Sequence, residues 1–314
     1  WDSIISHDDH LRLITYCLKE EKTNFENLLS SCNKTNLTKG FLNYYSYNDL
    51  QSSKKNRNKE AIQFLDKLIS LAEYRKLTQV FNPEQGKWLV SDLNFIKILE
   101  NVFNYKGKNI EPFVSPNFTY GLQHQNNFYC LKDLKSLYTA IKIEELFRIY
   151  KFNQISEIGS GLGYLPYYSF ILNNFNYNVY DLPNILILQA YFLMISLGED
   201  KIHLYGESKN KDKQVSLLPY WEIFNVNENK ILWISQDSIP EIDSNLSKKY
   251  FDKISNCSSS YFLSINQESK NINVAGSIQE PVYSIIRGIN NFELLNRSRD
   301  FLRKGYIEEF YMIR

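Results

Sequence analysis

Residues 157–163, Glu-Ile-Gly-Ser-Gly-Leu-Gly, form the pattern in this chain best suited to chemistry, and Asp181 follows 18 residues after the last glycine. Residues 155–158 are expected to form a short buried strand, and residues 162–172 the helix that follows it. Glycines between the two let a ligand approach the backbone where side chains would block it. Asp181 ends the next expected strand, 176–180, where a carboxylate can accept hydrogen bonds from ribose hydroxyls. The pattern predicts a nucleoside-binding turn.

The spacing of the glycines distinguishes between two kinds of nucleoside cofactor. Dinucleotide folds use G-x-G-x-x-G, whereas Gly159, Gly161 and Gly163 follow G-x-G-x-G and Tyr164 takes the place of the third dinucleotide glycine. Glu157 precedes the first glycine by two residues, and acid-x-G-x-G-x-G is the pattern of methyltransferases that use S-adenosylmethionine (SAM). SAM carries a sulfonium and an amino group but no pyrophosphate, so an acidic strand end suits it better. A nicotinamide-dependent oxidoreductase, a non-catalytic nucleoside-binding module and a glycine-rich turn without a ligand stay open as alternatives.

The residues expected to bind SAM lie in the turn and at the ends of the neighbouring strands. They are Glu157, Gly159, Ser160, Gly161, Gly163, Asp181, Leu182, Gln189 and Gln236. Gln189 is expected either to bond the cofactor or the glycine turn, or to be a buried amide satisfied by backbone. Gln236 is expected to line the adenine or methionine part of the site.

Methyl transfer to a hydroxyl requires alignment of the acceptor oxygen and removal of its proton. Four side chains are candidates for this work: Asp237, Glu241, Glu268 and His124. The three carboxylates follow the fourth and fifth expected strands, where each could act as a general base or bind a divalent cation such as Mg²⁺. Their structural alternatives are a cap for Asp237 and a helix start for Glu241. His124 lies in a long loop and is a natural base or a packing residue.

Strands and helices are expected to alternate from residue 152 onward. The expected strands are 155–158, 177–180, 202–205, 231–235 and 261–265, followed by an antiparallel pair at 292–295 and 306–313. The expected helices are 162–172, 185–197, 244–255 and 281–287. Such alternation predicts an α/β fold whose mostly parallel sheet is covered on both faces and binds ligands outside the carboxyl ends of its strands.

Residues 1–130 are expected to form a mainly helical cap that binds the acceptor, and residues 131–314 the SAM-binding domain. Apolar residues recur at intervals of three and four in 9–20 and 59–77, which predicts two helices. Residues 81–129 are expected to be rich in loops. No Gly/Ser-rich or Pro-rich linker precedes residue 131, which favours a cap over a tethered domain.

Several segments of the second half resemble the bacterial sugar O-methyltransferases. They are Tyr180-Asp181-Leu182-Pro183 and the segments 188–193, 236–242, 263–268 and 305–311, so the resemblance covers about residue 131 to the end. It implies a Rossmann-like, seven-stranded, mostly parallel methyltransferase sheet of class I, with SAM as methyl donor. It also implies a hydroxyl of a nucleotide sugar or surface glycan as acceptor, in polysaccharide biosynthesis. Asp-Leu-Pro also occurs in plant small-molecule O-methyltransferases, where the aspartate contacts the SAM ribose, so another small metabolite stays open as the acceptor.

Composition narrows the possible partners. The 36 basic and 35 acidic residues give a formal net charge of +1, whereas nucleic-acid-binding surfaces usually need a clear basic excess. The four cysteines form no C-x-x-C, so neither a disulfide framework nor a zinc site is expected, and the cytoplasm is the expected location. The longest apolar stretch, 185–197, is too short to span a membrane. We expect a small-molecule or glycan acceptor as partner, with a homo-oligomer left open.

Overall fold

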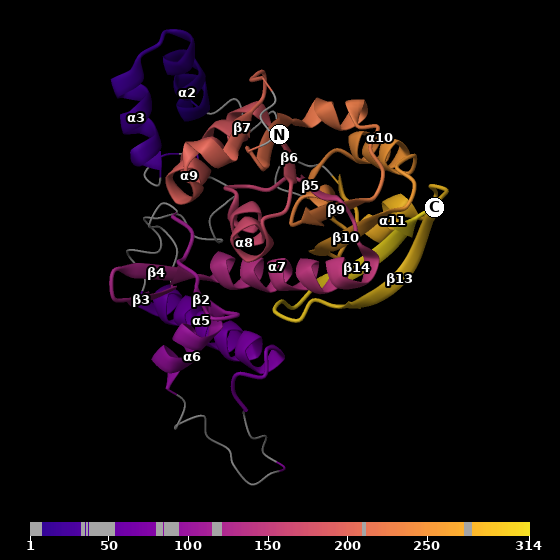
Figure 1. Ribbon diagram of the computed structural model, residues 1–314. Coiled ribbons are helices and arrows are strands. Elements are labelled where there is room, and N and C mark those ends of the chain that lie inside the picture. Colours follow the sequence, from indigo (N-terminus) through magenta and orange to yellow (C-terminus); the bar gives the residue numbers. More distant parts are fainter. Residues whose placement is uncertain are drawn as a thin grey trace.

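The computed structural model describes residues 8–32, 35, 37, 54–79, 84, 94–114, 121–208, 212–272 and 278–314 (Figure 1). The helices are α2 (Asp8–Leu18), α3 (Lys22–Ser30), α5 (Lys54–Tyr74), α6 (Phe95–Val102), α7 (Leu131–Tyr150), α8 (Tyr164–Asn173), α9 (Pro183–Leu197), α10 (Ser244–Ile254) and α11 (Val282–Ile286). The strands are β1 (Asn104–Tyr105), β2 (Lys108–Asn109), β3 (Gly121–His124), β4 (Asn127–Cys130), β5 (Gln154–Ile158), β6 (Tyr177–Asp181), β7 (Ile202–Leu204), β8 (Val215–Pro219), β9 (Ile231–Gln236), β10 (Ser260–Gln267), β11 (Asn271–Ile272), β12 (Ile278–Gln279), β13 (Phe292–Arg299) and β14 (Tyr306–Ile313).

The central sheet has the order β13-β14-β10-β9-β5-β6-β8-β7. Strands β7, β8, β6, β5, β9 and β10 run parallel, and β14 is antiparallel to both β10 and β13. This confirms the predicted α/β fold with a mostly parallel sheet and a final antiparallel pair. The chain moves outward in opposite directions from β5, first to β6 and later to β9. The end of β5 is therefore a topological switch point, where ligands of open α/β sheets bind.

The sheet contains one more strand than the seven expected. Residues 202–205 were predicted to be the third parallel strand, but β7 lies at the edge of the sheet and β8 lies between it and β6. The sequence of β8, Val-Ser-Leu-Leu-Pro, is short, follows a polar segment and ends in proline. Such features are typical of a loop, so the pattern of residues concealed a strand that its neighbours stabilise.

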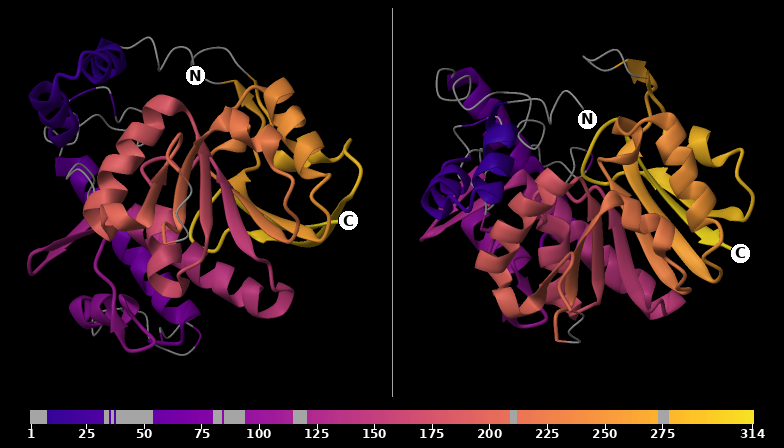
Figure 2. Two further views of the ribbon diagram at one scale, coloured as in Figure 1. Left: turned by 45° about the horizontal axis from the view of Figure 1, so that its top comes forward. Right: turned by 90° about the horizontal axis from the view of Figure 1, so that it is seen from above.

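Alternate residues of the central strands pack on opposite faces of the sheet. In β9, Leu232 and Ile234 pack with residues of α7, α8 and α9, whereas Ile231 and Trp233 pack with the 3-10 helix η5 (Tyr220–Asn225), α10 and α11. Figure 2 shows helices on either side of the twisted sheet. Because both faces are covered, most residues of the central strands are buried. The buried charged groups at the carboxyl ends of β5 and β6, Glu157 and Asp181, are exceptions that the site has to explain.

The N-terminal elements pack against the helices of the second half. The Tyr74 hydroxyl donates to Glu145 Oε2 at 2.7 Å, and the Tyr105 hydroxyl donates to Glu144 Oε2 at 2.6 Å, so α5 and β1 are both tied to α7. Helix α2 packs on α9, where the Asn184 Nδ2 and the Nδ1 of the fully buried His10 lie 3.1 Å apart. The region 81–129, expected to be rich in loops, contains α6 and the hairpins β1–β2 and β3–β4 in its described parts.

A buried carboxylate anchors the start of α7. Asp133 Oδ2 accepts a hydrogen bond from the Cys130 N–H at 2.7 Å. Its Oδ1 accepts from the Phe113 N–H at 3.2 Å and from the Tyr168 hydroxyl at 2.7 Å. Asp133 thus joins the chain before α7 to helix α8 and fixes where the first turn of α7 lies. Among the described helices, none is both long and apolar enough to cross a membrane.

Candidate functional site

The glycine turn between β5 and α8 holds its three glycines in the left-handed region of backbone space. Their φ angles are +75° at Gly159, +63° at Gly161 and +96° at Gly163, values that residues with a Cβ rarely adopt. A Cβ on Gly159 would also lie 2.5 Å from the Cβ of Ser238, and one on Gly163 would lie 3.0 Å from Leu193 Cδ1. The glycines are therefore required by the turn itself and by its packing, in addition to any ligand.

Asp181, at the end of β6, is tied to this turn. Its Oδ2 accepts hydrogen bonds from the Gly161 N–H at 3.3 Å and from Gln189 Nε2 at 2.8 Å, and its Oδ1 accepts from the Leu182 N–H at 2.8 Å. Gln189 Nε2 also donates to the Gly161 carbonyl at 2.7 Å. These two acceptors fix the orientation of the amide. Gln189 Oε1 is buried and accepts no hydrogen bond within the described part of the chain.

Glu157 and Asp181 are two buried carboxylates, exposed by only 2% and 6%. Glu157 Oε2 accepts a hydrogen bond from the Tyr177 hydroxyl at 2.9 Å. Burial raises the pKa of each carboxyl to about 7, and the charge of Asp181 contributes to the raised pKa of Glu157. No ion pair among the described residues involves either carboxylate. Ionised carboxylates in such a place are costly unless a positive charge comes close.

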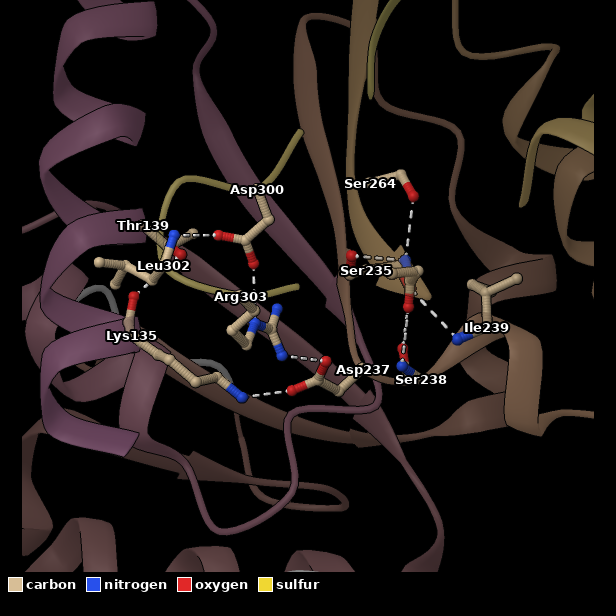
Figure 3. A network of polar contacts seen from close by, with 11 residues as sticks. Lys135, Thr139, Ser235, Asp237, Ser238, Ile239, Ser264, Asp300, Leu302 and Arg303 are labelled. Carbon is tan, nitrogen blue, oxygen red and sulfur yellow. Dashed lines mark hydrogen bonds and ion pairs between the residues drawn. The ribbon is translucent and has the colours of Figure 1, made fainter. Parts of the chain in front are cut away.

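A buried polar network that the sequence did not reveal joins the ends of β5, β9 and β10 (Figure 3). Ser238 Oγ donates to the Ile158 carbonyl at 2.5 Å and lies 2.9 Å from Ser235 Oγ. Asn266 Oδ1 accepts from the Ser238 N–H at 3.1 Å, and Asn266 Nδ2 donates to the Ser235 carbonyl at 3.0 Å and to Ser264 Oγ at 3.0 Å. The network fixes Ser238 against Gly159 and so stabilises the first residue of the glycine turn.

Asp237 lies beside this network and is held by two cations (Figure 3). Lys135 Nζ, from α7, pairs with Asp237 Oδ2, and Arg303 Nη1, from the β13–β14 connection, donates to Oδ1 at 2.5 Å. Arg303 Nε also donates to Asp300 Oδ2 at 2.7 Å, and its guanidinium lies 3.7 Å from the Tyr306 ring centroid. Burial works against ionisation of Asp237, but the two cations prevail and hold its pKa well below the usual range. Asp237 is therefore ionised and weakly basic.

Glu241 and Lys132 lie next to this ion pair. Glu241 ends the 3-10 helix η6 (Ile239–Glu241), and its side chain reaches solvent. The surrounding protein still removes part of the water around its carboxylate, and this desolvation together with the charge of Asp237 raises its pKa to about 7. Lys132 is in the first turn of α7, where burial and the charge of Lys135 lower its pKa to about 8. Its Nζ lies 5.9 Å from the ring centroid of Tyr164, the residue that follows the glycine turn. Two predicted candidates, Asp237 and Glu241, are thus brought together near the turn.

Glu268 follows the carboxyl end of β10, as Asp237 follows that of β9, but it has a different partner. It pairs with Arg297 of β13, whose Nε also lies 3.1 Å from Glu309 Oε1. These residues line a small, open hollow together with Tyr283. Within the described residues Glu268 forms neither a hydrogen bond nor an ion pair with Asp237.

His124 lies in the β3–β4 hairpin, which packs beside α5 (Figure 1). Its Nε2 is 3.1 Å from Glu100 Oε1 of α6. It has no hydrogen bond or ion pair to Asp237 or Glu241 in the described parts of the chain. No three His, Cys, Asp or Glu side chains in those parts come close enough together to hold a metal ion.

The groups around the turn suit a cationic nucleoside. Two carboxylates can balance a positive charge or accept from hydroxyls, while Gln189 Oε1 and Gln236 Oε1 are buried and lack a donor among the described residues. Ser160, at the tip of the turn, is half-buried. A buried amide oxygen without a donor is costly, so a ligand that offers hydroxyl or amino donors would be favoured here.

No protein-family model and no curated protein matches this chain. Among solved structures, the mitomycin 7-O-methyltransferase aligns with 58% of this chain and 55% of its own at 10% identity, with a TM-score of 0.42. The magnesium protoporphyrin IX methyltransferase from Synechocystis PCC 6803 with bound S-adenosyl-L-homocysteine (SAH) aligns with 61% of this chain and 90% of its own at 10% identity, with a TM-score of 0.42. A glycopeptide N-methyltransferase complexed with SAH aligns with 56% of this chain and 89% of its own at 11% identity, with a TM-score of 0.41. This chain spans little more than half of the first enzyme's length, and similarity at this level says nothing about activity.

Proposed function

We propose that this chain is a SAM-dependent methyltransferase that acts on a hydroxyl group of a small molecule. The observation that carries the proposal is the pair of buried carboxylates, Glu157 and Asp181, beside a glycine turn at the switch point of the sheet. A ligand that combines a ribose with a positive charge satisfies both carboxylates. The pyrophosphate of a nicotinamide dinucleotide would instead bring negative charge toward them.

In this proposal each residue near the turn has a distinct task. Asp181 accepts from the ribose hydroxyls, since its Oδ1 lies at the end of β6 and a carboxylate oxygen can accept more than the one hydrogen bond that the Leu182 N–H donates to it. Leu182 and Gln189 hold Asp181 in place, and Gln189 Oε1 accepts from the ligand. Glu157, in β5 just before the turn, balances the positive charge of the ligand, and Gln236 accepts a hydrogen bond from the ligand at its buried amide oxygen. Bound SAM supplies the activated methyl group, and the protein supplies binding, orientation and proton removal.

Glu241 is the proposed general base. Its carboxylate is exposed to an incoming acceptor, and a pKa of about 7 matches a base that works near neutral pH. Asp237 is a poorer base because Lys135 and Arg303 stabilise its ionised form. Its proposed task is to keep these two cations in place beside the reaction centre.

Other parts of the proposal concern the acceptor and the N-terminal region. A sugar hydroxyl is the first acceptor to test, on the basis of the sequence resemblance, and a hydroxyl of another small metabolite is the second. Residues 1–130 are proposed to cap the strand ends, because α5 and the β3–β4 hairpin lie against α7, whose first two turns contain Lys132 and Lys135. Glu268 and His124 stay as alternative bases, each already paired with another side chain.

Calorimetric titration with SAM, SAH and NAD⁺ at pH 8 tests the proposal. We expect SAM and SAH to bind, SAM more tightly because of its sulfonium charge, and NAD⁺ not to bind. Asp181→Ala should weaken SAM binding by about 1–3 kcal/mol, the cost of losing a buried acceptor, whereas the exposed Asp252→Ala should leave it unchanged. A preference for NAD⁺, or no binding of SAM and SAH, would refute it.

A further inference from the structure

Three basic side chains gather next to the glycine turn. Lys132 and Lys135 belong to the first two turns of α7, and Arg303 comes from the β13–β14 connection. Lys135 and Arg303 meet at the carboxylate of Asp237, as Figure 3 shows. Lys132 is close enough to this pair to interact electrostatically with both Lys135 and Asp237. We call Lys132, Lys135 and Arg303 the cationic cluster.

The cationic cluster lies where an acceptor has to enter. Asp237 directly follows β9, the strand beside β5, and Lys132 lies over the ring of Tyr164 at the start of α8. The cluster therefore occupies the space between the glycine turn and the end of β9. The proposed base, Glu241, is within the electrostatic reach of both Lys132 and Lys135. Whatever molecule presents a hydroxyl to Glu241 comes close to these three cations.

Arg303 has a donor that the described protein does not use. Its Nε is bonded to Asp300 and its Nη1 to Asp237, but its Nη2 is buried and has no hydrogen-bond partner in the described part of the chain. A buried guanidinium N–H without an acceptor is costly. Lys135 uses one of its three donors on Asp237. Asp237 thus positions two cations whose remaining donors can bind further oxygen atoms.

We propose that the acceptor of this protein carries an anionic group, a carboxylate or a phosphate, that Arg303 and the two lysines bind beside the hydroxyl to be methylated. This inference rests on the proposed function and adds the chemical class of the acceptor. Charge-assisted hydrogen bonds from a guanidinium and two ammonium groups are the arrangement that carboxylates and phosphates require. An uncharged sugar would leave the Arg303 Nη2 donor without an anionic partner.

Titration of three sugars into SAH-saturated protein tests the inference: glucose, glucuronate and glucose 1-phosphate. We expect at least one anionic sugar to bind about tenfold or more tightly than glucose, the effect of one additional charged hydrogen bond. The two anions separate a carboxylate site from a phosphate site. Lys132→Gln and Arg303→Lys should each reduce the preference for the anion about tenfold. Lys248→Gln removes the same charge from the exposed face of α10 and should leave the preference unchanged.

Equal affinity for all three sugars, or no binding by either anion, overturns the inference. So does an anion preference that Lys132→Gln and Arg303→Lys leave intact, since the anion would then bind elsewhere. SAH binding in the same samples keeps the two claims apart. If SAH binds and the anions do not, only the acceptor class is wrong. If SAH does not bind, the proposed function fails, and the sugars are then titrated into the ligand-free protein with the same criteria.

Discussion

Replacement of Glu157 by glutamine is expected to stabilise the ligand-free protein at pH 8 and to change little at pH 5. Burial raises the pKa of Glu157 from 4.5 to about 7 in the folded protein. The folded state therefore holds this proton more tightly than the unfolded state, and wild-type stability falls as the pH rises from about 4.5 to about 7. A pKa difference of about 2.5 corresponds to about 3 kcal/mol at pH 8. Glutamine does not ionise and can still accept from the Tyr177 hydroxyl, so it avoids this cost.

Urea unfolding at pH 5 and pH 8, followed by the fluorescence of the four tryptophans, measures the effect. Glu26→Gln, an exposed carboxylate of α3, is the matched control and should change stability by less than about 0.5 kcal/mol at both pH values. The same Glu157→Gln variant should lose its preference for SAM over SAH, because the carboxylate that balances the sulfonium is gone. A stability change that is the same at both pH values would refute the reasoning, since it would show that Glu157 does not carry a raised pKa.

Three further predictions concern the turn, the anchor of α7 and the base. Gly159→Ala should lower the free energy of unfolding by about 2–4 kcal/mol in urea, because its Cβ would meet Ser238 and its φ is +75°. The control Gly206→Ala, with φ +91° and nothing within 4 Å of the added Cβ, should lower it by only about 1–2 kcal/mol. Equal losses would show that the Ser238 contact does not matter. Asp133→Ala should cost about 3 kcal/mol, because three buried donors lose their acceptor, and hydrogen exchange of the Phe113 amide should accelerate; unchanged exchange would contradict the anchor. In a methyl-transfer assay, Glu241→Gln should lower turnover about 10²–10⁴-fold, and wild-type activity should fall as the pH drops below about 7, where the Glu241 carboxylate becomes protonated; a wild-type profile that is flat across this range would exclude Glu241 as the base.

The sequence alone determined the local features of the site. The glycine spacing predicted the turn between a strand and a helix, because three closely spaced glycines in a strand-to-helix segment allow backbone angles that other residues resist. Asp181 was correctly placed at the end of the next strand, since strand ends follow from the run of apolar residues before them. The antiparallel pair at 292–295 and 306–313 was likewise predicted, although β13 continues to Arg299.

Only the tertiary structure decided which side chains meet. Lys135 and Asp237 are 102 residues apart and Arg303 is 66 residues beyond Asp237, so no spacing in the sequence predicts their contact. Their meeting depends on how α7 and the β13–β14 connection pack against the end of β9. Strand β8 was hidden for the same reason, because its hydrogen bonds to β6 and β7 stabilise a segment whose own residues are typical of a loop. The raised pKa of Glu157 also required the fold, since residue type sets the ordinary pKa but burial and neighbouring charge, which arise only on packing, shift it.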